Sequence, residues 1–468
     1  MGSVTPKPRQ KTPDHIDQLD TARLPGYIPQ STQPETRRSH SHKQLFLYFY
    51  LLCLITIHPF YMDGTQFLGT QGWANILAQN TAATKVHNLL SNIPPGTDRH
   101  NKTEKIVVKQ AIEHIVNQMS LDQKIGQMLM IQFVGPTFSL PLSTMINQYY
   151  IGSVLLFSAN GNIENKSQLT ELTQQMQQDS KQNNAGLPVS IAIDQEGGAV
   201  DRLRQLDGTR PAEAVLGASN DPNKAREAGQ QDARNLSSYG ITLNLAPVVD
   251  VDSQPDSELH RDQRTYGETP AIVTSMANAY LQGLQQSGKV VGTLKHFPGL
   301  GSVVVDPHFG IPSLTRTQNE LENIDWKPYR DLIHTGRVHA IMVTHELVPA
   351  IENTLPSSLS PTIVHHILRD EMGFKGVIMT DSLTMTGITS YYTPSQAAVL
   401  AIKAGSDMIM GTSTPDEVAT TIASIKQAIN TGILTQNRID MSVRRILFLK
   451  YQMGLLPMLK HQFMHYTH

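Results

Sequence analysis

The sequence predicts an α/β protein whose main part is a single (β/α)8 barrel of the TIM type. Eight short apolar runs recur between amphipathic stretches in residues 104–456. Continuous apolar runs are typical of parallel strands buried on both faces, and the helices between them supply the crossovers. Eight such units close on themselves as a barrel. The expected strands are 128–133, 153–157, 189–193, 241–251, 290–294, 338–343, 376–379 and 407–410.

The composition is that of an ordinary globular protein. The 468 residues include 38 Lys and Arg and 40 Asp and Glu, so the formal charge of −2 excludes the basic footprint of a nucleic-acid-binding protein. A hydrophobic fraction of 39% and a charged fraction of 17% exclude the disordered and multi-span membrane classes. Cys53 is the only cysteine, which excludes an intrachain disulfide and a cysteine-based zinc site.

Three segments precede the expected barrel. Residues 1–44 contain six prolines and no apolar periodicity, so we expect a disordered basic tail. The hydrophobic segment 45–62 begins with thirteen uncharged residues. A membrane span needs about 17 to 25 residues and a signal-peptide core about 7 to 15, so we expect an anchor or export signal, with a buried helix as the alternative. Residues 63–103 are rich in Gly, Asn, Thr and Gln and are expected to form a flexible linker.

The charge distribution around the hydrophobic segment predicts its orientation. Basic residues precede it, so the tail should stay in the cytoplasm while the following residues are exported. We therefore expect a membrane-anchored or secreted protein whose barrel lies outside the cytoplasm. No small-residue cleavage site follows the segment, so its removal stays open. Neither the composition nor the motifs indicate an oligomeric state.

The expected barrel domain covers residues 104–456 and is followed by a C-terminal tail at 457–468. Residues 106–119 have helical periodicity. Ser120 with Gln123 three residues later is the pattern of a capping box and predicts the start of a second helix.

Polar residues end five of the eight expected strands. Any one of them could be a helix cap or a solvated loop charge. In (β/α)8 barrels, however, functional groups gather at the carboxyl ends of the strands, so their recurrence there predicts a site. The residues are Asp194 and Glu196, Asp250 and Asp252, Lys295 and His296, His345 and Glu346, and Asp381. By contrast, His334, His339, His365 and His366 fall in helices or flanks, and we expect them to be surface or packing histidines.

The segment 295–308 carries the most informative motif. Gly299 and Gly301 loosen a loop that leaves a strand end and leads to Asp306 and His308. Pro307 favours extended backbone, so the two side chains should project to the same side. An Asp beside a His is suited to proton transfer, because the carboxylate can orient the ring and the ring can act first as acid and then as base. A metal ligand or a loop-stabilising hydrogen bond is the alternative.

A second motif runs from 367 to 382 and ends in Asp381. An ionised carboxylate at the end of a buried strand is placed to attack an electrophilic carbon in the barrel mouth. Together, these two motifs resemble glycoside hydrolase family 3, and most closely its β-N-acetylglucosaminidase branch. The resemblance covers roughly residues 118–455. Further matching pieces are 119–128, 193–198 with Arg202, 244–251 and 264–267.

The resemblance implies a retaining exo-β-N-acetylglucosaminidase that acts on β-linked glycans such as cell-wall peptidoglycan fragments. Asp381 would be the nucleophile, and His308, oriented by Asp306, would protonate the leaving oxygen and later activate water. The terminal N-acetylglucosamine would be bound by Asp194, Arg202, Arg264, Lys295 and His296. No metal and no organic cofactor is implied.

The sequence departs from the family pattern at three positions. The family usually has a polar residue at Leu300, Ser or Thr at Pro307, and Arg at Ala199. The first change removes a polar group from the loop and the second stiffens the segment between Asp306 and His308. We expect both changes to affect loop closure and therefore rate.

Three other interpretations stay open at this stage. A family 3 β-glucosidase often carries a second α/β domain, whereas 468 − 381 = 87 residues follow Asp381 here; a phosphorylase would use phosphate in place of water on the same intermediate. A catalytically weak barrel that binds cell-wall glycan is the alternative outside the enzymes. Asp381, Asp306 and His308 argue against it, because a binding module has no need of them.

Overall fold

The computed structural model describes residues 99–184, 186–305, 310–457 and 459. Several predicted segments lie outside these ranges: the tail 1–44, the hydrophobic segment 45–62, residues 63–98 of the linker, the loop residues Asp306, Pro307 and His308, and most of the C-terminal tail. In the part of the chain that is described, no helix combines the length and the apolar character needed to cross a membrane.

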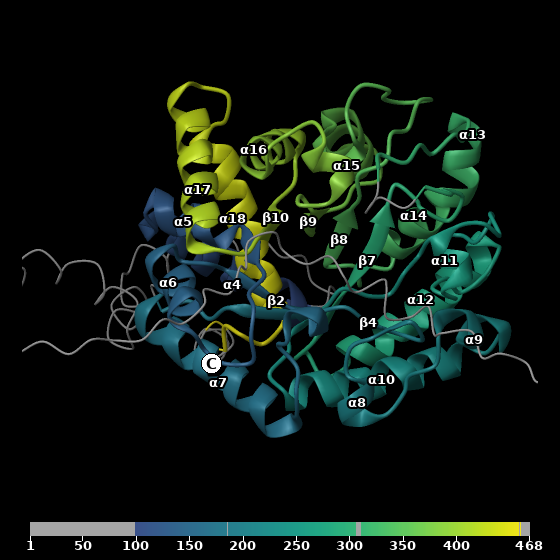
Figure 1. The fold of residues 1–468 in the computed structure, drawn as a ribbon, viewed down its shortest axis with the longest axis horizontal. Helices are drawn as coiled ribbons and strands as arrows, with labels where there is room; N and C mark the ends of the chain where they lie inside the picture. Colours follow the sequence, from purple (N-terminus) through teal and green to yellow (C-terminus); the bar gives the residue numbers. More distant parts are fainter. Residues whose placement is uncertain (1–98, 185, 306–309, 458, 460–468) are drawn as a thin grey trace, which may run out of the picture. The chain divides into compact units, whose positions relative to one another are not determined.

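Parallel strands form a closed barrel at the centre of the described residues (Figure 1). The order around the barrel is β1-β10-β9-β8-β7-β6-β3-β2, and every neighbouring pair is parallel. The predicted (β/α)8 fold is confirmed, and each expected strand overlaps one of these strands. Their bounds are β1 Leu129–Ile131, β2 Ser153–Leu156, β3 Ser190–Ile193, β6 Leu243–Asn244, β7 Val291–Phe297, β8 Ala340–Val343, β9 Val377–Ser382 and β10 Met408–Thr412.

The barrel strands are buried almost throughout, as continuous apolar runs require. The exception is β9, whose last two residues, Asp381 and Ser382, are half-buried at its carboxyl end. The expected strand 241–251 is the one that is clearly shorter, since regular pairing in β6 ends at Asn244. Pro247 cannot donate a ladder hydrogen bond. Pairing with β7 resumes only at a single bridge between Val248 and Lys295.

Helices follow the strands and surround the barrel (Figure 1). The α-helices are α4 Arg99–Gln118, α5 Leu121–Gln127, α6 Leu140–Gln148, α7 Lys166–Asn183, α8 Arg204–Asp207, α9 Glu213–Ala218, α10 Pro222–Ser238, α11 Glu258–Arg261, α12 Pro270–Gln285, α13 Gln318–Glu320, α14 Lys327–His334, α15 Thr386–Thr389, α16 Pro394–Ala404, α17 Pro415–Asn430 and α18 Gln436–Gln452. Short 3-10 turns lie at Ser158–Asn160 and Ser357–Leu359, and π-helical segments at Leu321–Asp325 and Thr362–Glu371. A separate two-stranded antiparallel sheet pairs β4 Gln195–Gly197 with β5 Val200–Asp201.

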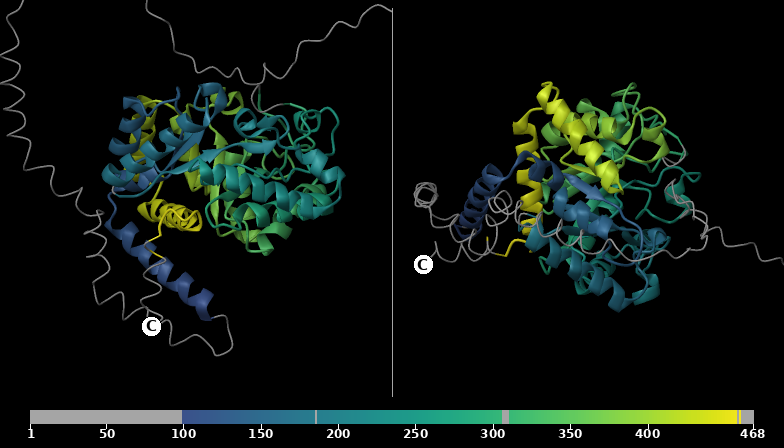
Figure 2. Two further views of the ribbon diagram at one scale, coloured as in Figure 1. Left: turned by 90° about the horizontal axis from the view of Figure 1, so that it is seen from below. Right: turned by 60° about the vertical axis from the view of Figure 1, so that its left-hand side comes forward.

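The helices at the start of the described chain are fixed by local and long-range contacts. The predicted capping box is confirmed: Gln123 N–H donates to Ser120 Oγ at 3.2 Å, and Ser120 N–H donates to Gln123 Oε1 at 2.8 Å. Helix α4 begins at Arg99, so the last residues of the expected linker are helical. Both views of Figure 2 show α4 beside α18, and the Arg444 guanidinium of α18 donates to Glu113 of α4 at 2.5 and 2.7 Å.

Glycines bring α10 and α12 into close contact. A Cβ atom added at Gly283 would lie 2.0 Å from the carbonyl oxygen of Arg226, and one at Gly229 would lie 2.2 Å from that of Tyr280. No larger residue fits either place without moving the backbone. The contact brings Tyr280 within hydrogen-bonding distance of Asn244 in β6, at 3.1 Å.

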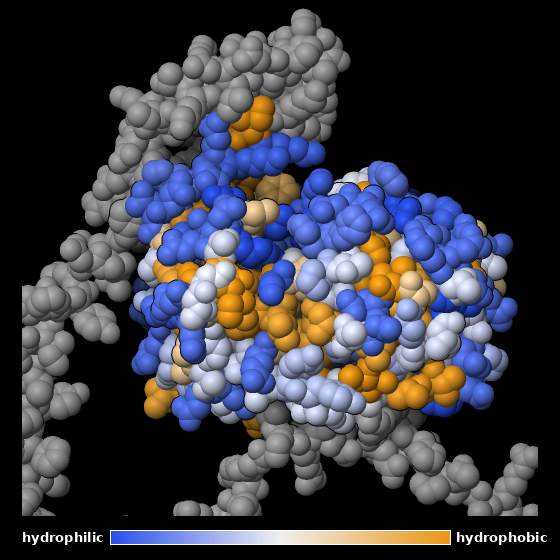
Figure 3. All heavy atoms as spheres, turned by 90° about the horizontal axis from the view of Figure 1, so that it is seen from above, coloured by the Kyte–Doolittle hydropathy of each residue, from blue (hydrophilic) through white to orange (hydrophobic). Residues whose placement is uncertain are grey.

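The large hydrophobic side chains that stay exposed come from separate segments of the described residues. They are Val134, Leu140, Val215, Val304, Val305, Tyr391, Ile433 and Met441. The face seen in Figure 3 carries a band of hydrophobic residues across its middle, with hydrophilic residues above it. Exposed apolar atoms of this kind are normal on a folded protein.

Candidate active site

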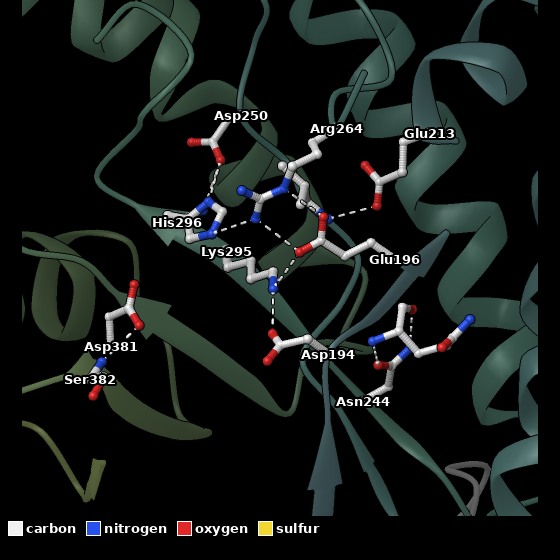
Figure 4. A network of polar contacts seen from close by, with 12 residues as sticks. Asp194, Glu196, Glu213, Asn244, Asp250, Arg264, Lys295, His296, Asp381 and Ser382 are labelled. Carbon is white, nitrogen blue, oxygen red and sulfur yellow. Dashed lines mark hydrogen bonds and ion pairs between the residues drawn. The ribbon is translucent and has the colours of Figure 1, made fainter. Parts of the chain in front are cut away.

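Polar side chains from four segments converge at the carboxyl end of the barrel (Figure 4). Asp194 directly follows β3 and Glu196 lies in β4, while Lys295 and His296 lie near the end of β7. Arg264 arrives from the segment between α11 and α12. The structure therefore brings together four of the five predicted sugar-binding residues, Asp194, Arg264, Lys295 and His296.

Glu196 is at the centre of this cluster. Its carboxylate accepts hydrogen bonds from Arg264 Nε at 2.8 Å and from Arg264 Nη2 at 3.0 Å, and forms an ion pair with Lys295 Nζ at 2.6 Å. Lys295 Nζ also donates to Asp194 Oδ1 at 2.7 Å. Arg264 Nη1 donates to Glu258 Oε1 at 2.8 Å. The two cations are thus each held by two carboxylates.

The opposite charges keep all three central groups ionised. Burial alone would raise the pKa of Glu196, but the charges and hydrogen bonds of Arg264 and Lys295 hold this pKa well below its ordinary value. Burial would likewise lower the pKa of Lys295, and the carboxylates of Asp194 and Glu196 raise it instead. The pKa of Arg264 is also raised, against its burial, by Glu196 and Glu258.

Asp250 contacts His296 on the side of the ring that faces away from Arg264. Its Oδ2 atom accepts from the backbone N–H of His296 at 3.0 Å and lies 2.8 Å from His296 Nδ1. The other ring nitrogen, Nε2, lies 3.4 Å from Arg264 Nη2, which can only donate. We therefore assign the ring hydrogen to Nδ1, which leaves Nε2 as an acceptor. Asp250 Oδ1 also accepts from the N–H of Leu300 at 2.7 Å, and the Leu300 side chain is buried in the core.

Asp381, the predicted nucleophile, lies to one side of this cluster, and the Asp194 carboxylate points toward that side in Figure 4. Its Oδ1 atom accepts from the backbone N–H of Ser382 at 2.7 Å. The segment that follows the neighbouring strand β8 supports this end of β9, because His345 Nε2 lies 3.0 Å from the carbonyl oxygen of Ser382 and His345 Nδ1 lies 2.8 Å from Ser358 Oγ. A carbonyl oxygen only accepts, so Nε2 carries the hydrogen.

Two further carboxyl groups near the site are buried, and the pKa of each is raised. Burial raises the pKa of Glu346 well above its ordinary value, and the neighbouring Asp250 and Asp381 raise it further. Glu213 in α9 behaves in the same way, because burial and the charge of Glu196 raise its pKa. One oxygen of Glu213 accepts from the N–H of Val248 at 2.9 Å. Neither group is a solvated acid at the mouth of the barrel.

The remaining predicted site residues have different outcomes. Arg202 follows β5, with its guanidinium carbon 4.8 Å from the centre of the Phe157 ring, a cation–π contact. Asp306 and His308 lie outside the described residues, so their pairing stays a prediction. His334, His365 and His366 are exposed and His339 is partly buried, as expected for surface and packing histidines. Among the described residues, no group of three or more His, Cys, Asp or Glu is arranged to hold a metal ion.

Sequence reasoning recognised Glu196 and Asp250 only as polar strand ends and assigned neither a role. For Glu196, the sequence did contain a usable signal. Asp194 and Glu196 are two residues apart, and side chains at that spacing in an extended segment lie on the same side, so Glu196 could have been placed beside Asp194. Glu258 had no such signal. Its partner Arg264 lies beyond the short helix α11, and only the fold shows which atoms meet.

The comparisons with known proteins agree on one family. Residues 120–449 match the N-terminal domain of glycosyl hydrolase family 3. Beta-hexosaminidase A of Pseudoalteromonas piscicida is 30% identical over 369 residues, which are 71% of this chain and 61% of that protein. Beta-hexosaminidase LpqI of Mycobacterium tuberculosis is 32% identical over 339 residues, covering 71% of this chain and 83% of that protein.

A solved structure is similar over the same part of the chain. The family 3 β-N-acetylglucosaminidase from Paenibacillus sp. str. FPU-7 superimposes with a TM-score of 0.69 and 32% sequence identity, covering 72% of this chain and 63% of that one. This chain therefore spans about three fifths of the length of the Paenibacillus and Pseudoalteromonas proteins.

Proposed function

Since this chain belongs to glycosyl hydrolase family 3, we propose that it is a retaining exo-β-N-acetylglucosaminidase. It removes a terminal N-acetylglucosamine from β-linked glycans, with cell-wall peptidoglycan fragments as the expected source. One observation carries the proposal: the cluster of charged hydrogen-bonding groups around Glu196, Lys295 and Arg264 lies at the same open end of the barrel as the half-buried Asp381. The names of the related hexosaminidases support it.

Asp381 is the proposed nucleophile. Its carboxylate attacks the anomeric carbon, the bond to the leaving oxygen breaks, and a glycosyl ester forms on Asp381. His308, oriented by Asp306, gives a proton to the leaving oxygen. In the second step His308 takes a proton from water, water attacks the anomeric carbon, and the ester bond to Asp381 breaks. These roles of Asp306 and His308 rest on the motif.

The charged cluster is the proposed subsite for the terminal sugar. Asp194, Arg202, Arg264, Lys295 and His296 offer both donors and acceptors, which a polyhydroxyl ligand needs. Two of the three N–H groups of Lys295 meet carboxylates, and among the contacts of the described residues the third is left for a sugar hydroxyl. A site with buried polar groups discriminates strongly against an analogue that lacks the matching hydroxyl.

The location is a separate proposal. The hydrophobic segment 45–62 follows a basic tail, and this order favours an exported barrel that is anchored to the membrane or secreted. Fractionation of cells that express the full chain tests it. Recovery of the protein only in the soluble cytosolic fraction would contradict export.

The activity is tested by comparing turnover of an aryl β-N-acetylglucosaminide with that of the matched aryl β-glucoside. We expect preference for the N-acetyl sugar, no turnover by Asp381→Ala and strongly reduced turnover by His308→Ala, with all proteins checked for folding. Turnover of the glucoside alone would indicate a β-glucosidase. A sugar phosphate as product in phosphate buffer would indicate a phosphorylase. No turnover by folded wild-type protein would indicate a glycan-binding barrel.

A further inference from the structure

We propose that Glu196 is a positioning residue for the sugar subsite: it fixes the orientation of Lys295 and Arg264. This inference rests on the proposed function, because it concerns how that subsite binds N-acetylglucosamine. The side chain of Glu196 is only 1% exposed and both its oxygens meet protein cations. It therefore acts on the sugar through its partners.

The hydrogen-bond geometry shows how the orientation is fixed. Lys295 is held at two points, Asp194 Oδ1 at 2.7 Å and Glu196 Oε1 at 2.6 Å. Since an ammonium group is tetrahedral, these two contacts also determine the direction of its third N–H. Arg264 is held by both oxygens of Glu196 in the two-point manner typical of guanidinium–carboxylate pairs. One carboxylate thus aligns two cations.

The charges around Lys295 show why its ionisation depends on Glu196. The charged groups that shift its pKa most are Asp194, Glu196 and Arg264, and the buried carboxyl group of Glu213 also interacts with its charge. Its side chain is 3% exposed, so burial and the Arg264 charge both favour the neutral amine. Asp194 and Glu196 oppose them, since both carboxylates raise the pKa of Lys295. Without the charge of Glu196, the pKa of Lys295 falls and the subsite loses a cation as the pH rises.

The neighbouring acid Glu213 explains how Glu196 keeps its own charge. Two buried carboxyl groups in close proximity do not ionise together. Here the cations lie on Glu196, whereas Glu213 meets the N–H of Val248. The cations hold the pKa of Glu196 low, whereas burial and the charge of Glu196 raise the pKa of Glu213, so Glu196 is the more readily ionised of the two.

The test uses the full chain and measures binding of free N-acetylglucosamine by ligand-observed NMR across about pH 6 to 9.5. Binding of this reaction product does not require the proton donor. We expect Glu196→Gln to raise Kd about 30-fold at neutral pH, as removal of a buried charge partner weakens its site. Its Kd should rise further with increasing pH, unlike that of the wild type.

Glu258→Gln is the matched control, because Glu258 contacts Arg264 but has no ion pair with Lys295 among the described contacts. It should raise Kd less than about 5-fold and keep the wild-type pH dependence.

A second variant keeps the inference testable if the Glu196→Gln protein does not fold. Glu196→Asp keeps the charge but shortens the reach, so we expect about tenfold weaker binding with the wild-type pH dependence. Wild-type affinity in either Glu196 variant, or an unchanged pH dependence in Glu196→Gln, would overturn the inference. If the wild type neither binds N-acetylglucosamine nor turns over its aryl glycoside, the proposed function fails instead, and this inference falls with it.

Discussion

The mouth and the base of the barrel both contain a buried carboxylate among basic side chains, but they use it differently. At the base, Asp407 precedes β10 and accepts from Arg369 at 2.7 Å, Arg445 at 2.9 Å and Ser442 at 2.8 Å. Its side chain is 0% exposed. At the mouth, Glu196 is equally buried, yet its partner Lys295 also meets Asp194, which is 18% exposed. The enclosed carboxylate of Asp407 stabilises the fold, whereas the partly open network around Glu196 is the proposed sugar subsite.

The balance of charge differs as well. In the described residues, Asp407 faces three guanidinium groups, Arg369, Arg438 and Arg445. Burial would raise the pKa of Asp407, but these cations lower it. Burial together with the neighbouring arginines lowers the pKa of Arg369 to about 10. At the mouth, by contrast, Lys295 and Arg264 are outnumbered by Asp194, Glu196 and Glu258. The base network thus has excess positive charge and the mouth network excess negative charge.

The largest effect is expected at the mouth. Asp381→Ala removes the proposed nucleophile, so kcat should fall by at least about 10⁴-fold. The midpoint of thermal unfolding should stay near that of the wild type, because the side chain is half-buried at a strand end. Steady-state kinetics and a thermal melt measure the two quantities. Substantial residual turnover by Asp381→Ala would show that Asp381 is not the nucleophile.

At the base of the barrel we expect a loss of stability with little change in turnover. Asp407→Asn leaves three arginines without their counter-charge, which should lower the free energy of unfolding by about 3 to 5 kcal/mol. Urea unfolding followed by circular dichroism measures this change. Turnover per folded molecule should stay within about twofold of the wild type. Lost turnover in an equally stable protein would contradict the division between mouth and base.

A smaller loss of stability is expected at the contact between α10 and α12. Gly283→Ala places a methyl group 2.0 Å from the carbonyl oxygen of Arg226, so the helices must separate. We expect the free energy of unfolding to fall by about 1 to 3 kcal/mol, despite the better helix propensity of alanine. Gly288→Ala is not a suitable control, because its φ of 64° disfavours alanine. Ser238→Ala, an exposed change at the end of α10, serves instead and should have little effect.

The next expected effect is a change in pH dependence. Lys450 is buried and its Nζ donates to Gln127 Oε1 and to the carbonyl oxygen of Pro188, both at 2.7 Å. Burial lowers the pKa of Lys450 from 10.5 to about 7. Between these values the unfolded chain binds a proton that the folded chain lacks, so this group makes stability fall as the pH falls, by about 1.4 kcal/mol per pH unit. Below pH 7 its penalty is complete.

Lys450→Met removes this contribution. We therefore expect the free energy of unfolding to depend less steeply on pH between about 7.5 and 9.5, whatever its absolute value. Urea unfolding at several pH values provides the slope. The exposed Lys403→Met is the matched control and should keep the wild-type slope. An unchanged slope in Lys450→Met would mean that the buried amine stays charged.

The smallest effect is expected for Glu213, a buried acid near the proposed sugar subsite. Its raised pKa favours the protonated form, and Glu213→Gln replaces that form by an amide of the same shape that keeps an oxygen to accept from Val248. Turnover should stay within about twofold, and the free energy of unfolding within about 1 kcal/mol, of the wild type. Kinetics and urea unfolding check both. A large loss of turnover would show that Glu213 is ionised and works with Glu196.

The eight apolar runs and the amphipathic stretches between them were sufficient to predict the barrel, because strands buried on both faces must be continuously apolar. The strand ends also predicted where the charged cluster lies, since parallel strands share one carboxyl end. The partners inside the cluster were not predictable. Arg264 and Glu196 are 68 residues apart, and only packing brings them together. The shortening of the strand expected at 241–251 shows a further limit, because apolar content alone does not reveal where Pro247 interrupts a ladder.

The most direct test of the account is to trap the covalent intermediate. A 5-fluoro β-N-acetylglucosaminyl fluoride should form the glycosyl ester quickly and lose it slowly, because the ring fluorine destabilises both transition states while the fluoride remains a good leaving group. We predict that mass spectrometry of the full chain finds one added glycosyl group, located on the peptide that contains Asp381. A protein that turns over the aryl β-N-acetylglucosaminide but is labelled on another residue, or on none, would contradict the account.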